Sequence, residues 1–176
     1  PDQPVENGLN CRLHKIDGKI VEQTYKIGGL YTECIEQIVY WLEKAKTVAE
    51  NEHQKESLTL LIKYYKTGDL KVWDDFNVSW VNDSLSVVDF VNGFIETYGD
   101  PMGMKATWES IVNFKDIEST KRTEIISSNA QWFEDNAPID KRFKKEKVKG
   151  VSAKVINVAQ LGGDCYPTTP LGINLP

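Results

Sequence analysis

The sequence is poor in the residues that build disulfide scaffolds and metal centres. Its 176 residues include three cysteines and two histidines, and no C-x-x-C pair is present. Three widely spaced cysteines exclude a disulfide framework and a zinc ribbon, and two histidines disfavour a metal site that needs several imidazoles. No apolar run approaches the ~20 residues of a membrane span. With 21 basic against 26 acidic side chains, the net charge is −5, which argues against bulk nucleic-acid binding.

What the chain does contain is typical of a globular protein. Apolar residues make up 40% of it, charged residues 27% and aromatic residues 10%, enough for a real core in one domain or two small lobes. No initiator Met is present, and the last residues, 171–176, have the pattern of a strand that is cut before it pairs. We therefore expect an excised piece of a larger protein, in which residues outside this chain complete the chemistry.

The first half of the sequence predicts a β-hairpin followed by helices. Residues 9–27 have strand-like patterns on both sides of Asp17-Gly18, a strong two-residue turn signal. Apolar residues then recur at helical spacing. They predict one helix over 35–49, a second around 58–65 that Gly68 ends, and a short third helix or turn over 69–81.

The second half predicts strands with one helix between them. Residues 94–98 and 107–114 are expected to form a hairpin with a turn-rich loop. A helix is predicted over 117–136, and a strand over 153–158 that leads through the loop Gly162-Gly163-Asp164 to the terminal strand. The predicted fold class is α+β, with a helical cluster and mostly antiparallel strands.

The motifs of common catalytic strategies are missing. His14 and His53 have no partner at metal-ligand spacing, and no G-x-S-x-G elbow exists. Gly28-Gly29 precedes a helix but lacks the lysine and the third glycine of a phosphate-binding loop, so a plain turn is predicted. The basic run Lys141–Lys149 is typical of a solvated helix face.

Glu96 and Tyr98 form the most informative pair. They lie two residues apart in a predicted strand, so both side chains are expected on one face, and the turn residues Asp100-Pro101 that follow suit the rim of a cleft. A carboxylate can hold an ammonium group, and a phenol can donate a hydrogen bond to a developing oxyanion. From the residues alone, a tyrosine packed at a strand end beside a solvated glutamate is the simpler interpretation.

Several stretches resemble the sequences of one peptidase family. The most specific is DFVNGFIETYGDP at 89–101. Further matches are PLGINLP at 170–176, GGLY at 28–31, VAENE at 48–52 and YYKTGDL at 64–70. These matches span essentially the whole chain, which resembles the dipeptidyl peptidase III family of zinc exopeptidases and is closest to its bacterial members.

The resemblance implies a segment of a longer, two-lobed enzyme. Its upper lobe is mostly helical and carries zinc, its lower lobe contains a β-barrel core, and the substrate cleft lies between them. The zinc ligands of the family come from an H-E-x-x-G-H motif and a later glutamate; this chain contains neither motif, so zinc is expected in the intact enzyme with no ligand from this chain. The implied parts are a lower-lobe segment over 1–116, a helical excursion toward the upper lobe over 117–152, and a return to the lower lobe over 153–176.

The resemblance also gives roles to single residues. Tyr98 corresponds to the catalytic tyrosine that hydrogen-bonds the scissile carbonyl, and Glu96 to the acid that anchors the N-terminal ammonium of the peptide. Gly172 and Asn174 fall on the strand beside which the substrate lies extended, as an added β-strand. A second asparagine that the family has just after Pro176 is missing here.

The expected function is therefore that of a cleft segment of a dipeptidyl peptidase that removes dipeptides from the free N-terminus of peptides. The segment alone is expected to be inactive. The expected partners are a peptide and the remainder of the peptidase, with no nucleic acid and no membrane, and the expected location is cytoplasmic. Two alternatives stay open: a non-catalytic peptide-binding module, and a structural interaction domain in which Glu96 and Tyr98 are merely packed.

Overall fold

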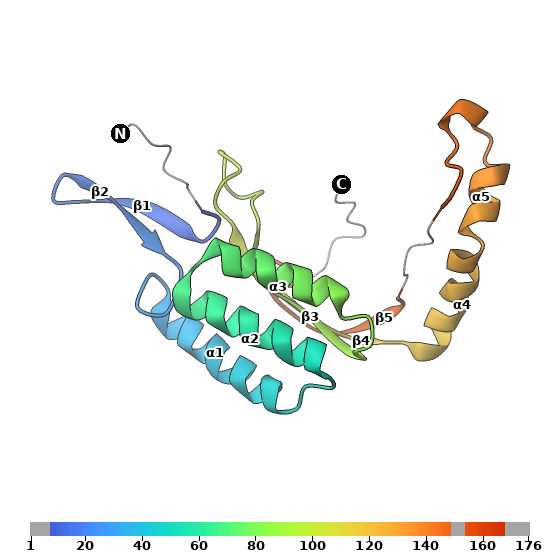
Figure 1. Ribbon diagram of the computed structural model, residues 1–176. Coiled ribbons are helices and arrows are strands. Elements are labelled where there is room, and N and C mark those ends of the chain that lie inside the picture. The colour runs from blue at the N-terminus through green and yellow to red at the C-terminus, as the bar shows by residue number, and fades with distance from the viewer. Residues whose placement is uncertain (1–7, 149–153, 168–176) are drawn as a thin grey trace.

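The computed structural model describes residues 8–148 and 154–167. Within them the chain forms a β-hairpin, a layer of three helices, a three-stranded sheet and a helical arm that projects from the sheet (Figure 1). The pairs of neighbouring strands are antiparallel, so the predicted α+β class is confirmed. No helix in the described ranges is long and apolar enough to cross a membrane.

The predicted N-terminal hairpin is present. Strand β1 (Cys11–Ile16) pairs with β2 (Lys19–Thr24), with Cys11 opposite Thr24. Asp17 and Gly18 connect them with positive φ angles of 50° and 79°. A two-residue hairpin turn of this kind needs φ > 0 at both positions, which Asp and Gly tolerate better than most residues.

Three helices form one layer, α1 (Thr32–Thr47), α2 (Glu52–Thr67) and α3 (Leu70–Asn82), and the third is a full helix where a short helix or turn was predicted. Capping explains two of their ends: the Asn51 side chain accepts from the backbone of Gln54 at 3.0 Å, and Gly68 ends α2 with a φ of 72°. The predicted apolar faces point into the core, whose helical members include Ile35, Val39, Leu42, Leu58, Leu61, Ile62, Tyr65, Trp73 and Phe76.

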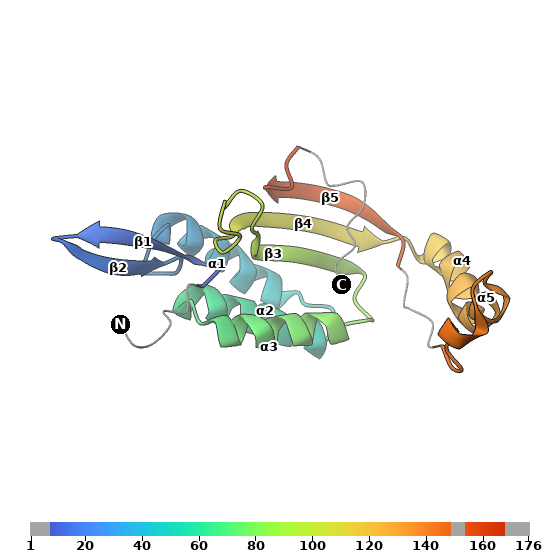
Figure 2. The same cartoon turned by 90° about the horizontal axis from the view of Figure 1, so that it is seen from above.

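The sheet consists of β3 (Val88–Glu96), β4 (Thr107–Lys115) and β5 (Ile156–Gly163), in the order β3-β4-β5. Figure 2 shows α2 and α3 along one side of this sheet. Gly93 permits the close approach, because a Cβ on Gly93 would lie 2.3 Å from the Trp73 ring on α3. A glycine in mid-strand is thus required by helix–sheet packing.

Two strand predictions were too short. β3 begins at Val88 rather than at residue 94, because residues 88–94 pair with β4 all along their length. β5 begins at Ile156 and continues through Gly162 and Gly163, which were predicted as a loop. Both glycines pair with β4, and a Cβ on Gly163 would lie 2.1 Å from the backbone oxygen of Trp108, so tertiary packing explains their presence in a strand.

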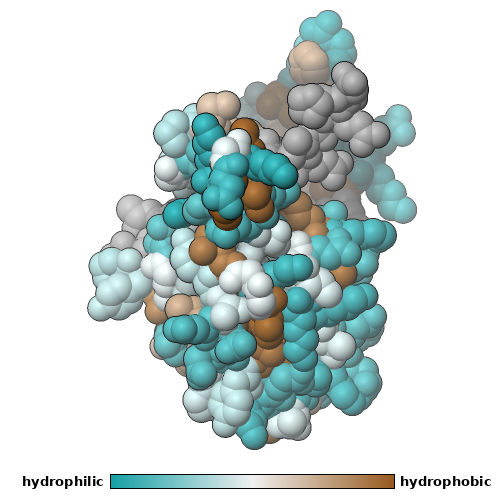
Figure 3. Space-filling model, turned by 90° about the vertical axis from the view of Figure 1, so that its left-hand side faces the viewer, coloured by the Kyte–Doolittle hydropathy of each residue, from teal (hydrophilic) through white to brown (hydrophobic). Residues whose placement is uncertain are grey.

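Exposed apolar side chains occur on the hairpin as well as elsewhere. Figure 3 views the molecule from the side of the hairpin and shows hydrophobic residues among hydrophilic ones. The exposed apolar residues of the hairpin are Leu13, Ile16, Ile20 and Val21. Scattered exposure of this kind is normal on a small structure.

The arm was predicted as one helix over 117–136 but contains two, α4 (Ile117–Ser128) and α5 (Ala130–Asn136). The break lies at Asn129, whose side chain donates to the Ile125 carbonyl at 2.7 Å while Ser128 donates to the same oxygen at 2.9 Å. Side-chain hydrogen bonds of this type compete with the helical backbone.

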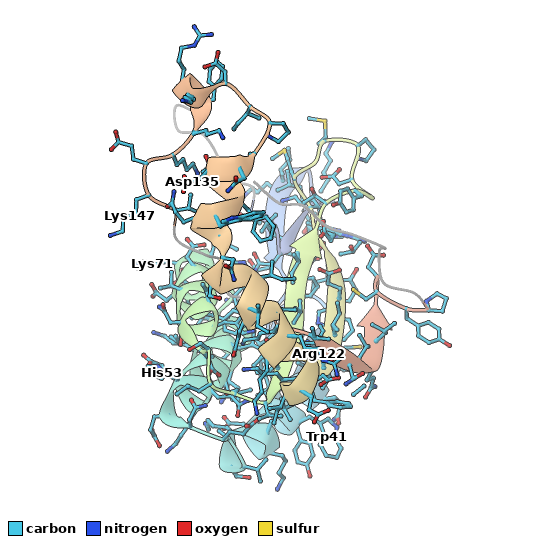
Figure 4. The ribbon with its side chains drawn as sticks, turned by 90° about the vertical axis from the view of Figure 1, so that its right-hand side faces the viewer. Trp41, His53, Lys71, Arg122, Asp135 and Lys147 are labelled. Atoms are coloured by element: carbon cyan, nitrogen blue, oxygen red, sulfur yellow. The ribbon has the colours of Figure 1, made fainter. Side chains whose placement is uncertain are left out.

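The basic run follows the arm, and its described part is largely not helical, so the prediction of a helix face is wrong. In its described part, residues 141–148, Lys141–Phe143 form a short 3-10 helix, and the following residues return along α5, where the Val148 amide donates to Gln131 at 2.8 Å. Lys147 is exposed, as predicted for the run (Figure 4).

Candidate functional site

The loop between β3 and β4 carries the tyrosine that was predicted to be catalytic. β3 ends at Glu96, so Tyr98 lies in the loop and not in the strand, and the same-strand argument for this pair is wrong. The pairing register with β4 shifts just before this end, between Phe94 and Glu96. A bulge of this type re-aims the side chains that follow it.

Asp100 shapes the rest of this loop. Its carboxylate accepts hydrogen bonds from the backbone amides of Met102, Met104 and Lys105, at 3.1, 2.9 and 2.7 Å. These hydrogen bonds, led by that from Met104, lower the pKa of Asp100. An ionised Asp100 thus organises the loop that presents Tyr98.

Tyr98 and Glu96 are neighbours in spite of the strand end. The Tyr98 side chain is 80% exposed. A hydrogen bond with the Glu96 carboxylate raises the pKa of Tyr98, and the negative charge of Glu96 adds to this effect. The phenol is therefore a protonated and accessible hydrogen-bond donor at neutral pH.

Three carboxylates lie at this end of the sheet: Glu96 at the end of β3, Glu109 on β4 and Asp164 directly after β5. The Thr107 hydroxyl on β4 lies 3.1 Å from the Glu96 backbone oxygen, at the end of β3, and 2.8 Å from Asp164 Oδ2, directly after β5. It ties the ends of β3, β4 and β5 together.

Glu109 is the buried member of this group, with 8% exposure. Burial raises its pKa, the hydrogen bond from Cys165 acts in the opposite direction, and the charges of Glu96 and Asp164 raise the pKa further. Cys165 Sγ donates to Glu109 Oε2 at 3.2 Å, and burial raises the pKa of the Cys165 thiol to about 11. The thiol therefore stays protonated and acts as a donor that positions Glu109.

The three carboxylates and Tyr98 together are suited to bind a ligand with a positively charged group next to a carbonyl that accepts a hydrogen bond. Carboxylates at the sheet end attract a cation, and Tyr98 offers a hydrogen bond beside them. Glu109 and Asp164 were missed by sequence reasoning. Glu109 lies two residues from Thr107 in a predicted strand, so side-chain alternation could have identified it. Asp164 could be identified only by recognising that β5 pairs with β4.

Other predicted residues are either elsewhere or outside the described ranges. Gly172 and Asn174 lie outside them. His14 is on β1 and His53 on α2. Over residues 8–148 and 154–167, no group of three or more His, Cys, Asp or Glu side chains is placed to hold a metal ion. The zinc implied by the resemblance therefore does not fit this part of the chain.

A groove of about 760 Å³ lies on the helical layer, away from these residues. His53 and Asp75 line it on α2 and α3, and none of the predicted site residues does. Figure 4 shows His53 on the helices. Because the groove does not contain Tyr98 or Glu96, the end of the sheet is the stronger candidate site.

Comparison with known proteins gives a match to one family model and several relatives that share a name. The sequence model described as "Peptidase family M49" matches residues 8–176. "Dipeptidyl peptidase 3" of Dictyostelium discoideum is 30% identical over 165 residues, which cover 92% of this chain and 23% of that protein. "Dipeptidyl peptidase 3" of Homo sapiens is 28% identical over 148 residues, 84% of this chain and 20% of that protein. The chain thus spans less than a quarter of the length of these curated relatives.

A solved structure has the same fold. The structure of DPP III from Caldithrix abyssi superimposes with a TM-score of 0.81 at 22% identity, and the match covers 97% of this chain and 32% of that one. At this level of identity the likeness concerns the fold. It shows that the hairpin, helical layer and sheet described above occur together as part of a larger structure.

Proposed function

Because this chain belongs to peptidase family M49, we propose that it forms part of the substrate cleft of a dipeptidyl peptidase. The enzyme would remove dipeptides from the free N-terminus of peptides. Two findings support this proposal: relatives named "Dipeptidyl peptidase 3" match most of the chain, and the exposed Tyr98 follows Glu96 by two residues, close enough for the Glu96 carboxylate to raise the pKa of Tyr98. The second finding carries it, because it supplies chemistry on this chain's own residues.

Glu96 is assigned the binding of the substrate's α-ammonium group. A carboxylate at a strand end attracts a cation, and Asp164 contributes negative charge nearby. The buried Glu109 strengthens the local negative potential when it is ionised. An exopeptidase must measure distance from the amino terminus, and a fixed carboxylate can provide the reference point.

Tyr98 is assigned the polarisation of the scissile carbonyl. Its phenol is exposed, and the raised pKa keeps it protonated at neutral pH, so it can donate to a substrate oxygen. A donor that binds the developing oxyanion more strongly than the ground-state carbonyl accelerates the chemical step. The loop held by Asp100 supplies the orientation that this requires.

Gly172 and Asn174 are assigned to the substrate-binding strand. An extended peptide that pairs with this strand gains backbone hydrogen bonds along its length. This pairing would keep the N-terminal residues in register with Glu96 and Tyr98. The two roles come from the resemblance of residues 170–176 to the family sequence.

The metal chemistry of the enzyme is assigned to the remainder of the protein. No described group of this chain fits a zinc ion, so zinc would be held by residues elsewhere. The roles of this chain are binding of the ammonium group and hydrogen-bond donation. A preparation of this chain alone would then lack hydrolytic activity.

The helical arm and the 3-10 helix that follows it are assigned to the contact with that remainder. Exposed apolar side chains gather on α4, α5 and the 3-10 helix, and they are Ile125, Ile126, Trp132, Phe133 and Phe143. A projecting arm with so much exposed apolar surface is typical of an interface. On this proposal, residues 117–152 dock onto the zinc-bearing lobe.

The test compares free and blocked peptides with the intact protein that contains this chain. Peptides of one sequence are offered with a free or an acetylated N-terminus, and the products are identified by mass spectrometry. The proposal expects dipeptides from the free peptide and almost none from the acetylated one, because acetylation removes the ammonium group. Binding without cleavage would instead support the peptide-binding alternative, and no binding would support the structural one.

A further inference from the structure

Lys105 and Cys11 meet at the base of the hairpin although 94 residues separate them in sequence. Lys105 Nζ lies 2.7 Å from Cys11 Sγ and donates to the Gly8 carbonyl at 2.9 Å. The Cys11 thiol donates to the same carbonyl at 3.2 Å and is 1% exposed. The amine and the thiol are therefore held face to face by a shared backbone acceptor.

The separation of nitrogen and sulfur is unusually small for an ordinary polar contact. An N–H···O hydrogen bond spans about 2.7–3.2 Å, and sulfur is a larger atom than oxygen. At 2.7 Å the two atoms are nevertheless too far apart for a direct S–N bond. The distance is the one that a single bridging atom would span.

We propose that oxidation joins Cys11 and Lys105 covalently through one oxygen atom, as an N–O–S bridge. This site lies outside the function proposed above and stands independently of it. The oxidant is a peroxide. Both reacting atoms are already in place, with Lys105 Nζ 2.7 Å from Cys11 Sγ.

The reaction balances with two molecules of hydrogen peroxide. The first oxidises the thiol to a sulfenic acid and releases water. The second oxidises the amine, after its ammonium form has lost a proton to solvent, to a hydroxylamine and releases a second water. The hydroxylamine oxygen then attacks sulfur, the S–OH bond breaks, and a third water leaves. Two dithiol molecules return the bridge to a thiol, an amine and one water, becoming two disulfides.

The surroundings of the Cys11 thiol determine how fast the bridge forms. Burial raises the pKa of Cys11, the nearby Glu22 carboxylate raises it further, and Lys105 acts in the opposite direction. A raised pKa reduces the thiolate fraction at neutral pH, so the bridge should form slowly there. Hydrogen peroxide is a small oxidant, which suits a thiol that is 1% exposed.

The bridge would fasten the loop that carries Tyr98. Lys105 and the adjacent Ala106 already connect this loop to residues 8–11, since the Ala106 amide donates to the Leu9 carbonyl at 2.9 Å. Figure 1 shows the loop between β3 and β4 beside the start of β1. A covalent link would replace a contact that solvent can open with one that only reduction can open.

Peptide mapping of the intact protein provides the test. After treatment with hydrogen peroxide at mildly alkaline pH, the protein is digested with trypsin without reductant. Modified Lys105 is not cleaved, so the tryptic peptide that ends at Arg12 should be joined to residues 72–115. The joined mass should exceed the sum of the two peptides by about 14 Da, one oxygen gained and two hydrogens lost, and dithiothreitol should separate them.

Matched variants decide the assignment. Lys105→Arg keeps the charge but removes the primary amine, and Cys11→Ser removes the sulfur, so both should abolish the joined peptide. Lys115→Arg and Cys34→Ser should retain it. The peptide map of the wild-type protein tests the proposal even if a variant fails to fold. Oxidised Cys11 without a joined peptide, or a joined mass about 2 Da below the sum, as a direct S–N bond would give, overturns the proposal.

Discussion

Trp108 on β4 donates a 2.9 Å hydrogen bond from its indole nitrogen to the hydroxyl of Tyr65 on α2. The same hydroxyl donates to Asn92 on β3 at 2.5 Å. Tyr65 is fully buried, so this one oxygen connects the helical layer to two strands in the absence of solvent. The strands that it connects are the ones that lead to Glu96 and Thr107.

Replacement of Tyr65 by Phe should destabilise the protein by about 1–3 kcal/mol, because the indole N–H and the Asn92 oxygen lose a buried partner. Urea unfolding of the intact protein measures the effect. Tyr40→Phe is the matched control, since Tyr40 is 51% exposed, and it should change stability little. Equal stability of the two variants would contradict the assigned role of the Tyr65 hydroxyl.

Gly93→Ala should cost about 1–3 kcal/mol of stability, because the new methyl group would lie 2.3 Å from the Trp73 ring and force helix and sheet apart. Gly99→Ala is the control, because its nearest neighbour is a Thr107 methyl at 3.9 Å. Thermal unfolding of both variants compares them. A Gly93→Ala protein as stable as the control would mean that α3 does not pack on β3 as described.

The loop after β3 should loosen at acid pH. The amide hydrogen bonds, that of Met104 first, lower the pKa of Asp100 in the folded state. The stability that the ionised Asp100 contributes is therefore fully present above the pKa of an unfolded aspartate, about 3.9. It is lost as the pH falls through the lower pKa of Asp100 in the folded state. The amide nitrogen shifts of Met104 and Lys105, followed by NMR, should titrate together with a midpoint below that of a free aspartate.

Asp100→Asn is the control for this titration. Its side-chain oxygen can still accept from the loop amides but has no charge to lose. The acid transition of the Met104 amide should therefore disappear in this variant. A transition that persists unchanged would show that another group controls the loop.

The arm should be covered in the intact protein. Trp132 is 59% exposed on α5, and Trp132→Lys should lower the stability of the intact protein by about 1.5–3 kcal/mol if another lobe buries this side chain. Arg122→Lys on α4 is the control, a change of one exposed basic residue into another. An unchanged unfolding midpoint in Trp132→Lys would leave the arm without its proposed contact.

The predictions from sequence succeeded where local signals and burial agreed. The turn at Asp17-Gly18, the cap at Gly68 and the apolar faces of the three helices are all present. The predictions from sequence failed where tertiary contacts determined the structure. Gly162 and Gly163 lie in β5 because they pack against Trp108, which only the folded sheet brings to them.

The same distinction applies to the site. The closeness of Glu96 and Tyr98 was predicted from strand alternation, but it arises from a loop that Asp100 holds after the strand has ended. Asp164 joins them through the pairing of β4 with β5, across more than fifty residues of intervening chain, and no local pattern indicates such a contact.

The contrast between Tyr98→Phe and Glu96→Gln tests the central claim most directly. The substrate ammonium is charged in both ground and transition states, so Glu96→Gln should appear largely as a raised KM. Tyr98→Phe removes only the hydroxyl of an exposed ring and should leave folding unaffected. Dipeptide release by the intact protein, with Tyr40→Phe as control, should show a fall in kcat of roughly 10²- to 10³-fold for Tyr98→Phe. A Tyr98→Phe enzyme that keeps kcat within a few-fold of the wild type would contradict the assignment of Tyr98 as the catalytic hydrogen-bond donor.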